Sequence, residues 1–169
     1  MASLNVAMVC LGNICRSPMA AAVLANKAKI VTQVGINVSS SGTSGWHIGQ
    51  GAHPTSQLVW EKAGYQHHHV ASQFKANDYF VNDYILVMDS SNYESVLALA
   101  SSEADRAKVF YLRSFDPALR HIDPISGEYF NLEVPDPYNQ SEDAYRDVLA
   151  MIESAVDGFI SHLIQGRDA

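Results

Sequence analysis

The chain has 169 residues, a formal net charge of -7 at pH 7 and 47% hydrophobic residues. This size and composition predict one domain over residues 1–169 with a packed core. The negative charge argues against nucleic-acid binding, and no apolar run reaches the ~18 residues that a membrane span needs. Because no basic, apolar leader opens the chain, we expect a cytoplasmic protein, with leaderless secretion left open.

Short apolar runs alternate with helical patterns in the first half of the chain. Ser17 suits the N-cap of the first helix, and Pro18 suits its first position. Gly64 suits the C-cap of the second helix. We predict strands over 5–9 and 36–41, and helices over 19–31 and 54–63.

The second half repeats this alternation and ends in a long amphipathic segment. Ser91 and Glu94 have the spacing of a capping box that starts a helix. We predict a helical turn over 78–80, strands over 84–88 and 108–112, and a last helix over 142–164. Strands that alternate with helices predict an α/β fold: a four-stranded parallel sheet flanked by helices on both faces, in a three-layer, flavodoxin-like architecture.

The segment between the first strand and the first helix carries the chemistry. A helix N-terminus binds phosphate and stabilises a thiolate, and ligands of parallel sheets bind at the carboxyl ends of strands. We therefore expect Cys10 to be a nucleophile and Arg16 to hold phosphate oxygens through its planar fork. Alternatively, both residues could have structural roles only: Cys10 as a small buried apolar residue and Arg16 as a member of a surface ion pair. The expected phosphate-binding loop is Leu11, Gly12, Asn13, Ile14, Cys15, Arg16 and Ser17.

A long aperiodic stretch lies between 113 and 140, and loops of this length in a compact domain are usually functional. It contains three Asp-Pro pairs, which begin at Asp116, Asp123 and Asp136. Each could supply a general acid, and each could simply start a turn. Pro residues on both sides of Asp136 make it the stiffest of the three, but the residues alone do not choose among them.

Residues 10–20, which read Cys-Leu-Gly-Asn-Ile-Cys-Arg-Ser-Pro-Met-Ala, resemble the signature of the low-molecular-weight protein tyrosine phosphatases. The resemblance continues over 40–49, 83–89 and 136–138, in the order found in that family. Asn139 departs from the pattern, because many members carry a second aromatic residue there. This departure bears on substrate preference.

The resemblance implies hydrolysis of phosphotyrosine-containing proteins and small aryl phosphates, without a metal or another cofactor. Cys10 would form a phosphocysteine intermediate, Arg16 would bind the phosphate, and Asp136 would act as general acid and base. We also expect inhibition by phosphate-like oxyanions, a protein that works away from membranes, and a monomer or weak dimer.

Supporting roles follow from the same resemblance. The walls of the substrate pocket would be Leu11, Trp46 and Tyr138, whose flat or apolar surfaces suit an aryl ring. His69 would support Asn13, which we expect in a left-handed conformation.

The remaining loop residues would act on the nucleophile. The Ser17 hydroxyl would hydrogen-bond the Cys10 thiolate, although Ser17 could also be a plain N-cap. Cys15 would be the redox partner that captures oxidised Cys10 as a disulfide, although it could also be a small filler.

Other functions stay open at this point. Arsenate reductases share the loop but need further cysteines, and this chain has two in all. Protein arginine phosphatases on the same scaffold carry threonine where Ile14 stands. A phosphotyrosine-binding module would keep the loop but lose the nucleophile or the acid. We expect no metal site, because the consecutive histidines 67–69 do not share one face.

Overall fold

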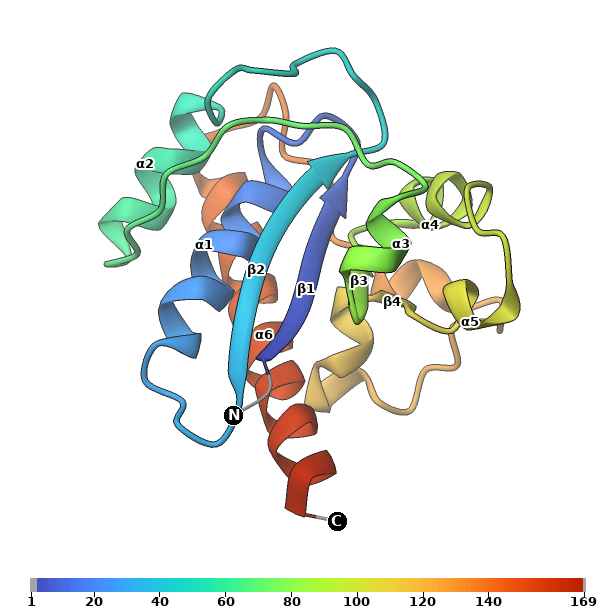
Figure 1. Ribbon diagram of the computed structural model, residues 1–169. Coiled ribbons are helices and arrows are strands. Elements are labelled where there is room, and N and C mark those ends of the chain that lie inside the picture. Colours follow the sequence, from blue (N-terminus) through green and yellow to red (C-terminus); the bar gives the residue numbers. More distant parts are fainter. Residues whose placement is uncertain (1–2, 169) are drawn as a thin grey trace.

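The structure, a computed structural model, describes residues 3–168. Its four strands form one parallel sheet in the order β2-β1-β3-β4 (Figure 1). Strand β1 is central, and its Val6 pairs with Val38 on one side and Tyr84 on the other. The strands are β1 (Ser3–Cys10), β2 (Gly35–Gly42), β3 (Tyr84–Val87) and β4 (Val109–Tyr111).

The helices are α1 (Arg16–Ala28), α2 (Pro54–Lys62), α3 (Asp78–Val81), α4 (Ser90–Leu97), α5 (Glu103–Arg106) and α6 (Glu142–Asp168). They cover both faces of the sheet, with α1 packed beside α6 (Figure 1). Alternate residues of β1 enter two separate cores, as the two-residue repeat of a strand requires. Val6 and Met8 pack with α1, α2 and α6, whereas Ala7 and Val9 pack with α3 and α4. The predicted α/β fold with helices on both faces is therefore confirmed.

The start of α1 differs from the prediction. The helix begins at Arg16, Cys15 occupies the N-cap position, and no side chain among the described residues caps it. The prediction that Ser17 is the N-cap is therefore wrong. Its hydroxyl lies against Cys10 Sγ and Asn13 Nδ2 instead. The first N–H groups of α1 are consequently left without a side-chain cap, which suits a helix end that binds an anion.

A capping box does start α4, but its residues differ from the predicted Ser91 and Glu94. The Asp89 carboxylate accepts a hydrogen bond from the backbone N–H of Asn92, and the Asn92 side chain accepts one from the backbone N–H of Asp89. Aspartate is as strong an N-cap as serine, and the helix begins two residues earlier than predicted.

Other element boundaries shift by a few residues. Helix α1 ends at Ala28, before the predicted residue 31, and α6 continues to Asp168, beyond the predicted residue 164. The sequence analysis did not predict α5 or the three short 3-10 turns η1 (Leu112–Phe115), η2 (Pro117–Leu119) and η3 (Tyr129–Leu132).

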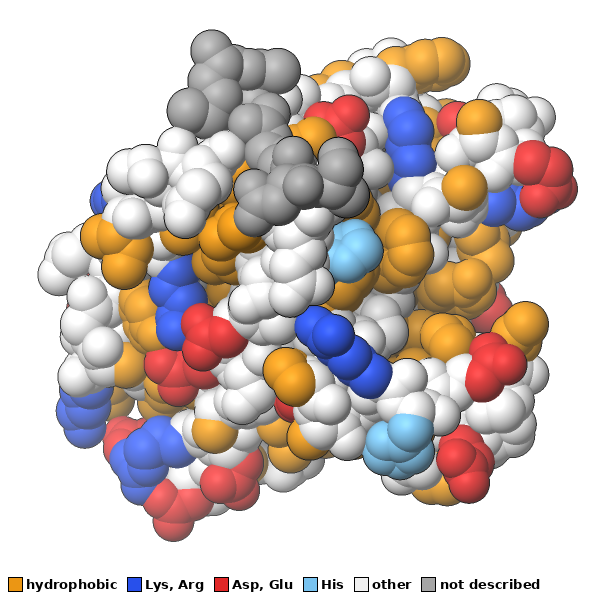
Figure 2. All heavy atoms as spheres, turned by 90° about the horizontal axis from the view of Figure 1, so that it is seen from below, with side chains coloured by type: hydrophobic (Ala, Val, Ile, Leu, Met, Phe, Trp, Pro, Cys, Tyr) orange, Lys and Arg blue, Asp and Glu red, His pale blue; other side chains and the backbone are white. Residues whose placement is uncertain are grey.

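The carboxyl ends of β1 and β3 lie at one edge of the sheet, where long connections cross above them (Figure 1). The N–H of Thr43 donates to the carbonyl of Cys10 (2.9 Å), and the N–H of Val134 donates to the carbonyl of Met88 (2.7 Å). The opposite end of the molecule carries interspersed charges of both signs (Figure 2). Among residues 3–168, no helix has the length and apolar character to cross a membrane.

Candidate active site

The loop between β1 and α1 is folded around Asn13, which is fully buried. Its φ of 56° is the predicted left-handed conformation. Its Nδ2 donates to the hydroxyls of Ser17 (2.7 Å) and Ser40 (3.0 Å). Its Oδ1 accepts from the N–H of Ser72 (2.9 Å), and its carbonyl accepts from His69 Nε2 (2.6 Å). These bonds hold the loop in one conformation before any ligand arrives.

His69 contacts the loop as an uncharged donor. The Asn13 carbonyl can only accept a hydrogen bond, so Nε2 of the ring carries the proton. Burial, opposed by this hydrogen bond, lowers the pKa of His69 below its ordinary value. A neutral ring at physiological pH is therefore sufficient for the contact.

Cys10 lies at the last position of β1, and its side chain is buried under the loop. Its Sγ is 3.0 Å from Ser17 Oγ. Gly42, at the end of the neighbouring strand, allows the loop to approach closely. A Cβ there would lie 2.7 Å from the carbonyl oxygen of Leu11 and 3.1 Å from the Asn13 nitrogen, so a larger residue would push the loop away.

Arg16, at the start of α1, is held by two other segments. Its Nη1 donates to Asp89 Oδ2 (2.7 Å) and to the carbonyl of Val134 (2.9 Å), and its Nη2 lies 3.6 Å from Asp136 Oδ2. The side chain is only 3% exposed. Burial by itself lowers the pKa of Arg16, but the attraction of Cys10 and Asp89 outweighs it, and the net pKa is raised. The guanidinium is therefore a fixed positive charge next to Cys10.

Asp136 belongs to residues 133–140, here called the Asp136 loop. Its Oδ1 accepts a hydrogen bond from the N–H of Tyr138 (3.1 Å), and its carbonyl accepts one from Gln140 Nε2 (3.0 Å). These bonds turn the loop so that the carboxylate faces Arg16 and Cys10 across one pocket. The carboxylate stays partly exposed, as a group that exchanges protons with water needs to be.

The other two Asp-Pro pairs act as turn starters. Asp116 Oδ1 accepts from the N–H of Ala118 (2.9 Å) and caps η2. Asp123 Oδ1 accepts from the N–H of Ile125 (3.0 Å). Neither aspartate lines the pocket that contains Cys10. Of the three aspartates, Asp136 is the one that lines this pocket.

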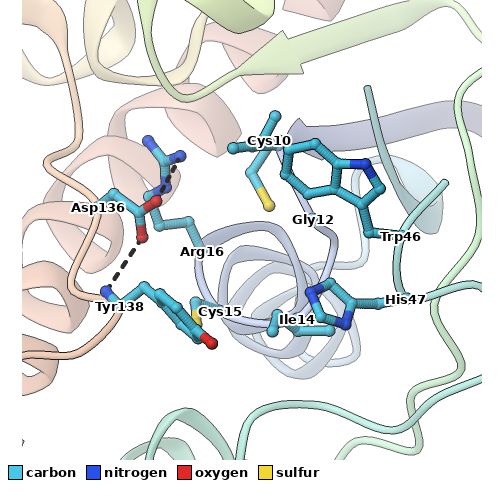
Figure 3. A pocket seen from close by; sticks show the side chains of 10 residues that line it. Cys10, Gly12, Ile14, Cys15, Arg16, Trp46, His47, Asp136 and Tyr138 are labelled. Atoms are coloured by element: carbon cyan, nitrogen blue, oxygen red, sulfur yellow. Dashed lines mark hydrogen bonds and ion pairs between the residues drawn. The ribbon is translucent and has the colours of Figure 1, made fainter. Parts of the chain in front are cut away.

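The pocket above Cys10, here called the Cys10 pocket, has a volume of about 200 Å³. Asp136 and Tyr138 lie on one side of it and Trp46 and His47 on the other (Figure 3). Trp46 is 72% exposed, so it is a wall residue and not part of the core. The lining residues are Cys10, Leu11, Gly12, Ile14, Cys15, Arg16, Trp46, His47, Asp136 and Tyr138.

Two residues of the site were missed in the sequence. Asp89 follows the apolar run of β3, and a carboxylate at the carboxyl end of a parallel strand is a signal that could have been used. His47 follows Trp46, and its Nδ1 is 3.0 Å from Gln50 Oε1. His47 lines the Cys10 pocket because residues 43–53 pass over the loop between β1 and α1. The sequence pattern does not show this path of the chain.

Cys15 is buried at the end of the loop and, like Cys10, lines the Cys10 pocket. Its Sγ is 3.6 Å from the hydroxyl of Tyr145, which is 3.3 Å from His53 Nδ1. Burial is the main cause that raises the pKa of Cys15 to about 11, with the Tyr145 hydrogen bond opposing it and Cys10 adding to it. At neutral pH Cys15 is therefore a neutral thiol.

Among the side chains that the structure describes, those of residues 3–166, no group of three or more His, Cys, Asp or Glu is arranged to hold a metal ion. In the histidine run, the rings of His67 and His69 stack at 6.5 Å, and His69 is committed to the Asn13 carbonyl. The charge that faces the Cys10 pocket is supplied by Arg16.

Comparisons with known proteins agree with this geometry. A sequence profile described as "Low molecular weight phosphotyrosine protein phosphatase" matches residues 5–168. A low molecular weight protein-tyrosine-phosphatase of Streptomyces coelicolor is 37% identical over 98% of both chains. A low molecular weight phosphotyrosine protein phosphatase of Schizosaccharomyces pombe is 31% identical, over 95% of this chain and 97% of its own.

Solved structures show the same likeness. The crystal structure of a protein tyrosine phosphatase from Entamoeba histolytica superposes with a TM-score of 0.83 and 31% identity, and the match covers 98% of this chain and 99% of that one. A low molecular weight phosphotyrosine phosphatase from Vibrio cholerae gives a TM-score of 0.80 at 27% identity, over 95% and 97% of the two chains. The chain therefore belongs to the low molecular weight phosphotyrosine protein phosphatase family and is a protein tyrosine phosphatase.

Proposed function

We propose that this phosphatase hydrolyses protein phosphotyrosine and small aryl phosphates without a metal ion, through a phosphocysteine intermediate on Cys10. One observation carries the proposal. Cys10 and Arg16 come from the two ends of the β1–α1 loop, Asp136 comes from a distant segment, and all three line one pocket. A nucleophile, a fixed cation and a carboxylic acid are the groups that two-step phosphate transfer through an enzyme nucleophile requires.

In the first step, the Cys10 thiolate attacks phosphorus, and the bond from phosphorus to the phenolic oxygen breaks. The protonated Asp136 gives its proton to the leaving oxygen. In the second step, Asp136 takes a proton from water as that water attacks phosphocysteine, so that inorganic phosphate leaves and the thiolate is restored. Arg16 and the backbone N–H groups of residues 11–17 bind the phosphate oxygens in both steps.

Ser17 supports the thiolate. Its Oγ accepts a hydrogen bond from Asn13 Nδ2 at 2.7 Å, so the hydroxyl hydrogen is available to Cys10 Sγ at 3.0 Å. A thiolate that accepts a hydrogen bond and lies at a helix N-terminus is stabilised relative to the thiol. His69 and Asn13 act through the shape of the loop.

The substrate preference follows from the pocket walls. Trp46, Tyr138 and Leu11 offer flat or apolar surfaces on which an aryl ring can lie above the phosphate site. We further propose a single domain over residues 1–169, a cytoplasmic location, a monomer or weak dimer, and inhibition by phosphate-like oxyanions that occupy the same loop.

A rapid-quench experiment tests the mechanism. The protein is mixed with a peptide that carries ³²P-phosphotyrosine, in the presence of EDTA, and acid-quenched within milliseconds. We expect the label on the tryptic peptide of residues 1–16, retained in Cys15→Ser and lost in Cys10→Ser, because both cysteines lie in that peptide, and turnover that EDTA does not reduce. Label on another residue, or activity that EDTA abolishes, would contradict the proposal.

We also propose that peroxide oxidises Cys10 to a sulfenic acid, which the sulfur of Cys15 attacks to form a disulfide and release water. The attacking form is the Cys15 thiolate, and the pKa of about 11 makes it scarce at neutral pH. Its fraction, and hence the rate of disulfide formation, should rise about tenfold per pH unit below that pKa.

Mass spectrometry after a brief peroxide pulse at pH 6, 7 and 8 measures this rate against sulfinic acid formation on Cys10. The ratio of disulfide to sulfinic acid should increase with pH, and Cys15→Ser should give sulfinic acid at every pH. A ratio that falls with pH, or a disulfide-free wild type, would contradict the redox role of Cys15.

A further inference from the structure

The back of the Asp136 loop faces a cavity. Leu132, just before this loop, and Val134 within it are buried, whereas Glu133 and Pro135 lie at the surface of a hollow of about 630 Å³. A second, smaller hollow of about 130 Å³ lies under Pro135 and Asp136 on the side of α6. Leu132 and Val134 anchor the start of the loop in the core, but Glu133, Pro135 and Asp136 border these hollows, so hydrogen bonds to the backbone help to fix the position of Asp136.

Besides the bond from the N–H of Val134 to the Met88 carbonyl, two arginines donate hydrogen bonds to the loop from opposite sides. Arg16 Nη1 donates to the carbonyl of Val134 at 2.9 Å from the side of the Cys10 pocket. Arg113 Nη1 donates to the adjacent carbonyl, that of Glu133, at 2.9 Å and more weakly to that of Asn131 at 3.4 Å. Arg113 also lines the larger hollow. Consecutive carbonyls, three and two residues before Asp136, are thus held by two guanidinium groups.

Arg113 is an unusual choice for this place on grounds of stability. It is half-buried, and it forms no ion pair with a carboxylate among residues 3–166, whose side chains the structure describes. Its Nε is buried without a hydrogen-bond partner. Burial, opposed by Asp116, lowers the pKa of Arg113. A buried charge without an ionic partner costs stability, so the contacts with the two carbonyls are its clearest use.

We propose that Arg113 is a positioning residue that holds the Asp136 loop from behind, so that Asp136 reaches the leaving oxygen. Arg113 lies outside the Cys10 pocket and touches neither the phosphate nor the nucleophile. The proposal rests on the role of Asp136 as general acid. Its consequence is specific: Arg113 affects proton donation more than it affects phosphate binding.

Substrates that differ in their need for a proton provide the test. Phosphotyrosine releases a basic phenolate and needs the acid, whereas 2,4-dinitrophenyl phosphate releases a weakly basic one and does not. The value of kcat/KM reports only the steps up to phenol release. In Arg113→Met, which keeps the length of the side chain but removes its donors, kcat/KM for a phosphotyrosine peptide should fall about tenfold. For the dinitrophenyl ester it should fall less than about twofold.

Three variants make the result interpretable. Asp136→Asn should show the same substrate order with a larger loss, and Arg113→Lys, which keeps a donor, should lie between wild type and Arg113→Met. Arg120 is an exposed arginine seven residues after Arg113, and Arg120→Met should leave kcat/KM unchanged for both substrates. The melting temperature of each variant is measured as a check on folding.

Equal losses for both substrates in Arg113→Met, or no loss for either, would overturn the positioning role while leaving the phosphatase mechanism intact. If Asp136→Asn itself showed no dependence on the leaving group, the assignment of the acid would fail, and the role of Arg113 would fail with it.

Discussion

Replacing Cys10 by serine should abolish hydrolysis while leaving phosphate binding intact. Serine has nearly the shape of cysteine and can keep the contact with Ser17 Oγ, so the buried loop should not rearrange. The hydroxyl is not ionised at neutral pH and is a far poorer nucleophile than a thiolate. We expect kcat for 4-nitrophenyl phosphate to fall by about 10⁵-fold, the scale on which removal of a catalytic nucleophile acts in other enzymes.

Binding of inorganic phosphate, measured by calorimetry, separates this outcome from misfolding. The Cys10→Ser protein should bind phosphate, because Arg16 and the loop N–H groups are unchanged. Cys15→Ser is the matched control from the same loop, and it should still form the phosphoenzyme. Substantial turnover by Cys10→Ser would mean that another group attacks phosphorus.

Most of the fold could be predicted from the sequence, because its strands and long helices have clear patterns of apolar residues. The continuous apolar run over 84–88 predicted the strand that the structure has at Tyr84–Val87, and the apolar stripe of α6 predicted a long amphipathic helix. The predictions that were wrong concern which of two neighbouring residues with similar chemistry caps a helix. At α4, Asp89 and Ser91 are both good N-caps, and only the packing of the helix selects Asp89.

The candidate site was predicted where it is local and missed where it is assembled from distant segments. Cys10 and Arg16 share one loop, so their proximity follows from the sequence. The pairing of Arg16 with Asp89 joins residues 73 positions apart, and the contact of Arg113 with Glu133 joins residues 20 apart within an aperiodic loop. No repeat or motif encodes such contacts, and they appear only when the chain is folded.

Arg16 links the parts of the site through one buried group. Its Nη1 is used by Asp89 at the start of α4 and by the Val134 carbonyl. The 3.6 Å from Nη2 to Asp136 Oδ2 is within ion-pair range but beyond a hydrogen bond, so this edge of the guanidinium remains able to bind phosphate. In the proposed mechanism, the same side chain therefore both positions the Asp136 loop and binds the phosphate.

Because Arg16 contacts Asp89 and the Val134 carbonyl and also binds phosphate in the proposed mechanism, we predict that another positively charged residue cannot replace it. In Arg16→Lys, a single ammonium must serve Asp89, the Val134 carbonyl and the substrate, and it lacks the planar fork that binds two oxygens at once. We expect kcat/KM for 4-nitrophenyl phosphate to fall by about 10³-fold or more, as when arginine is lost from other phosphoryl-transfer sites.

The split between kinetic parameters tests the explanation. Loss of phosphate binding should raise the inhibition constant of inorganic phosphate, and displacement of the Asp136 loop should also lower kcat. Arg16→Lys keeps a positive charge beside Asp89, so its melting temperature should stay closer to that of the wild type than the melting temperature of Arg16→Met does. An Arg16→Lys enzyme with kcat/KM within tenfold of the wild type would show that a positive charge suffices and that the bidentate geometry does not matter.

Arg16 holds the Val134 carbonyl and Arg113 holds the adjacent Glu133 carbonyl. Arg16→Lys should therefore also make hydrolysis more dependent on the leaving group, in the same direction as Arg113→Met.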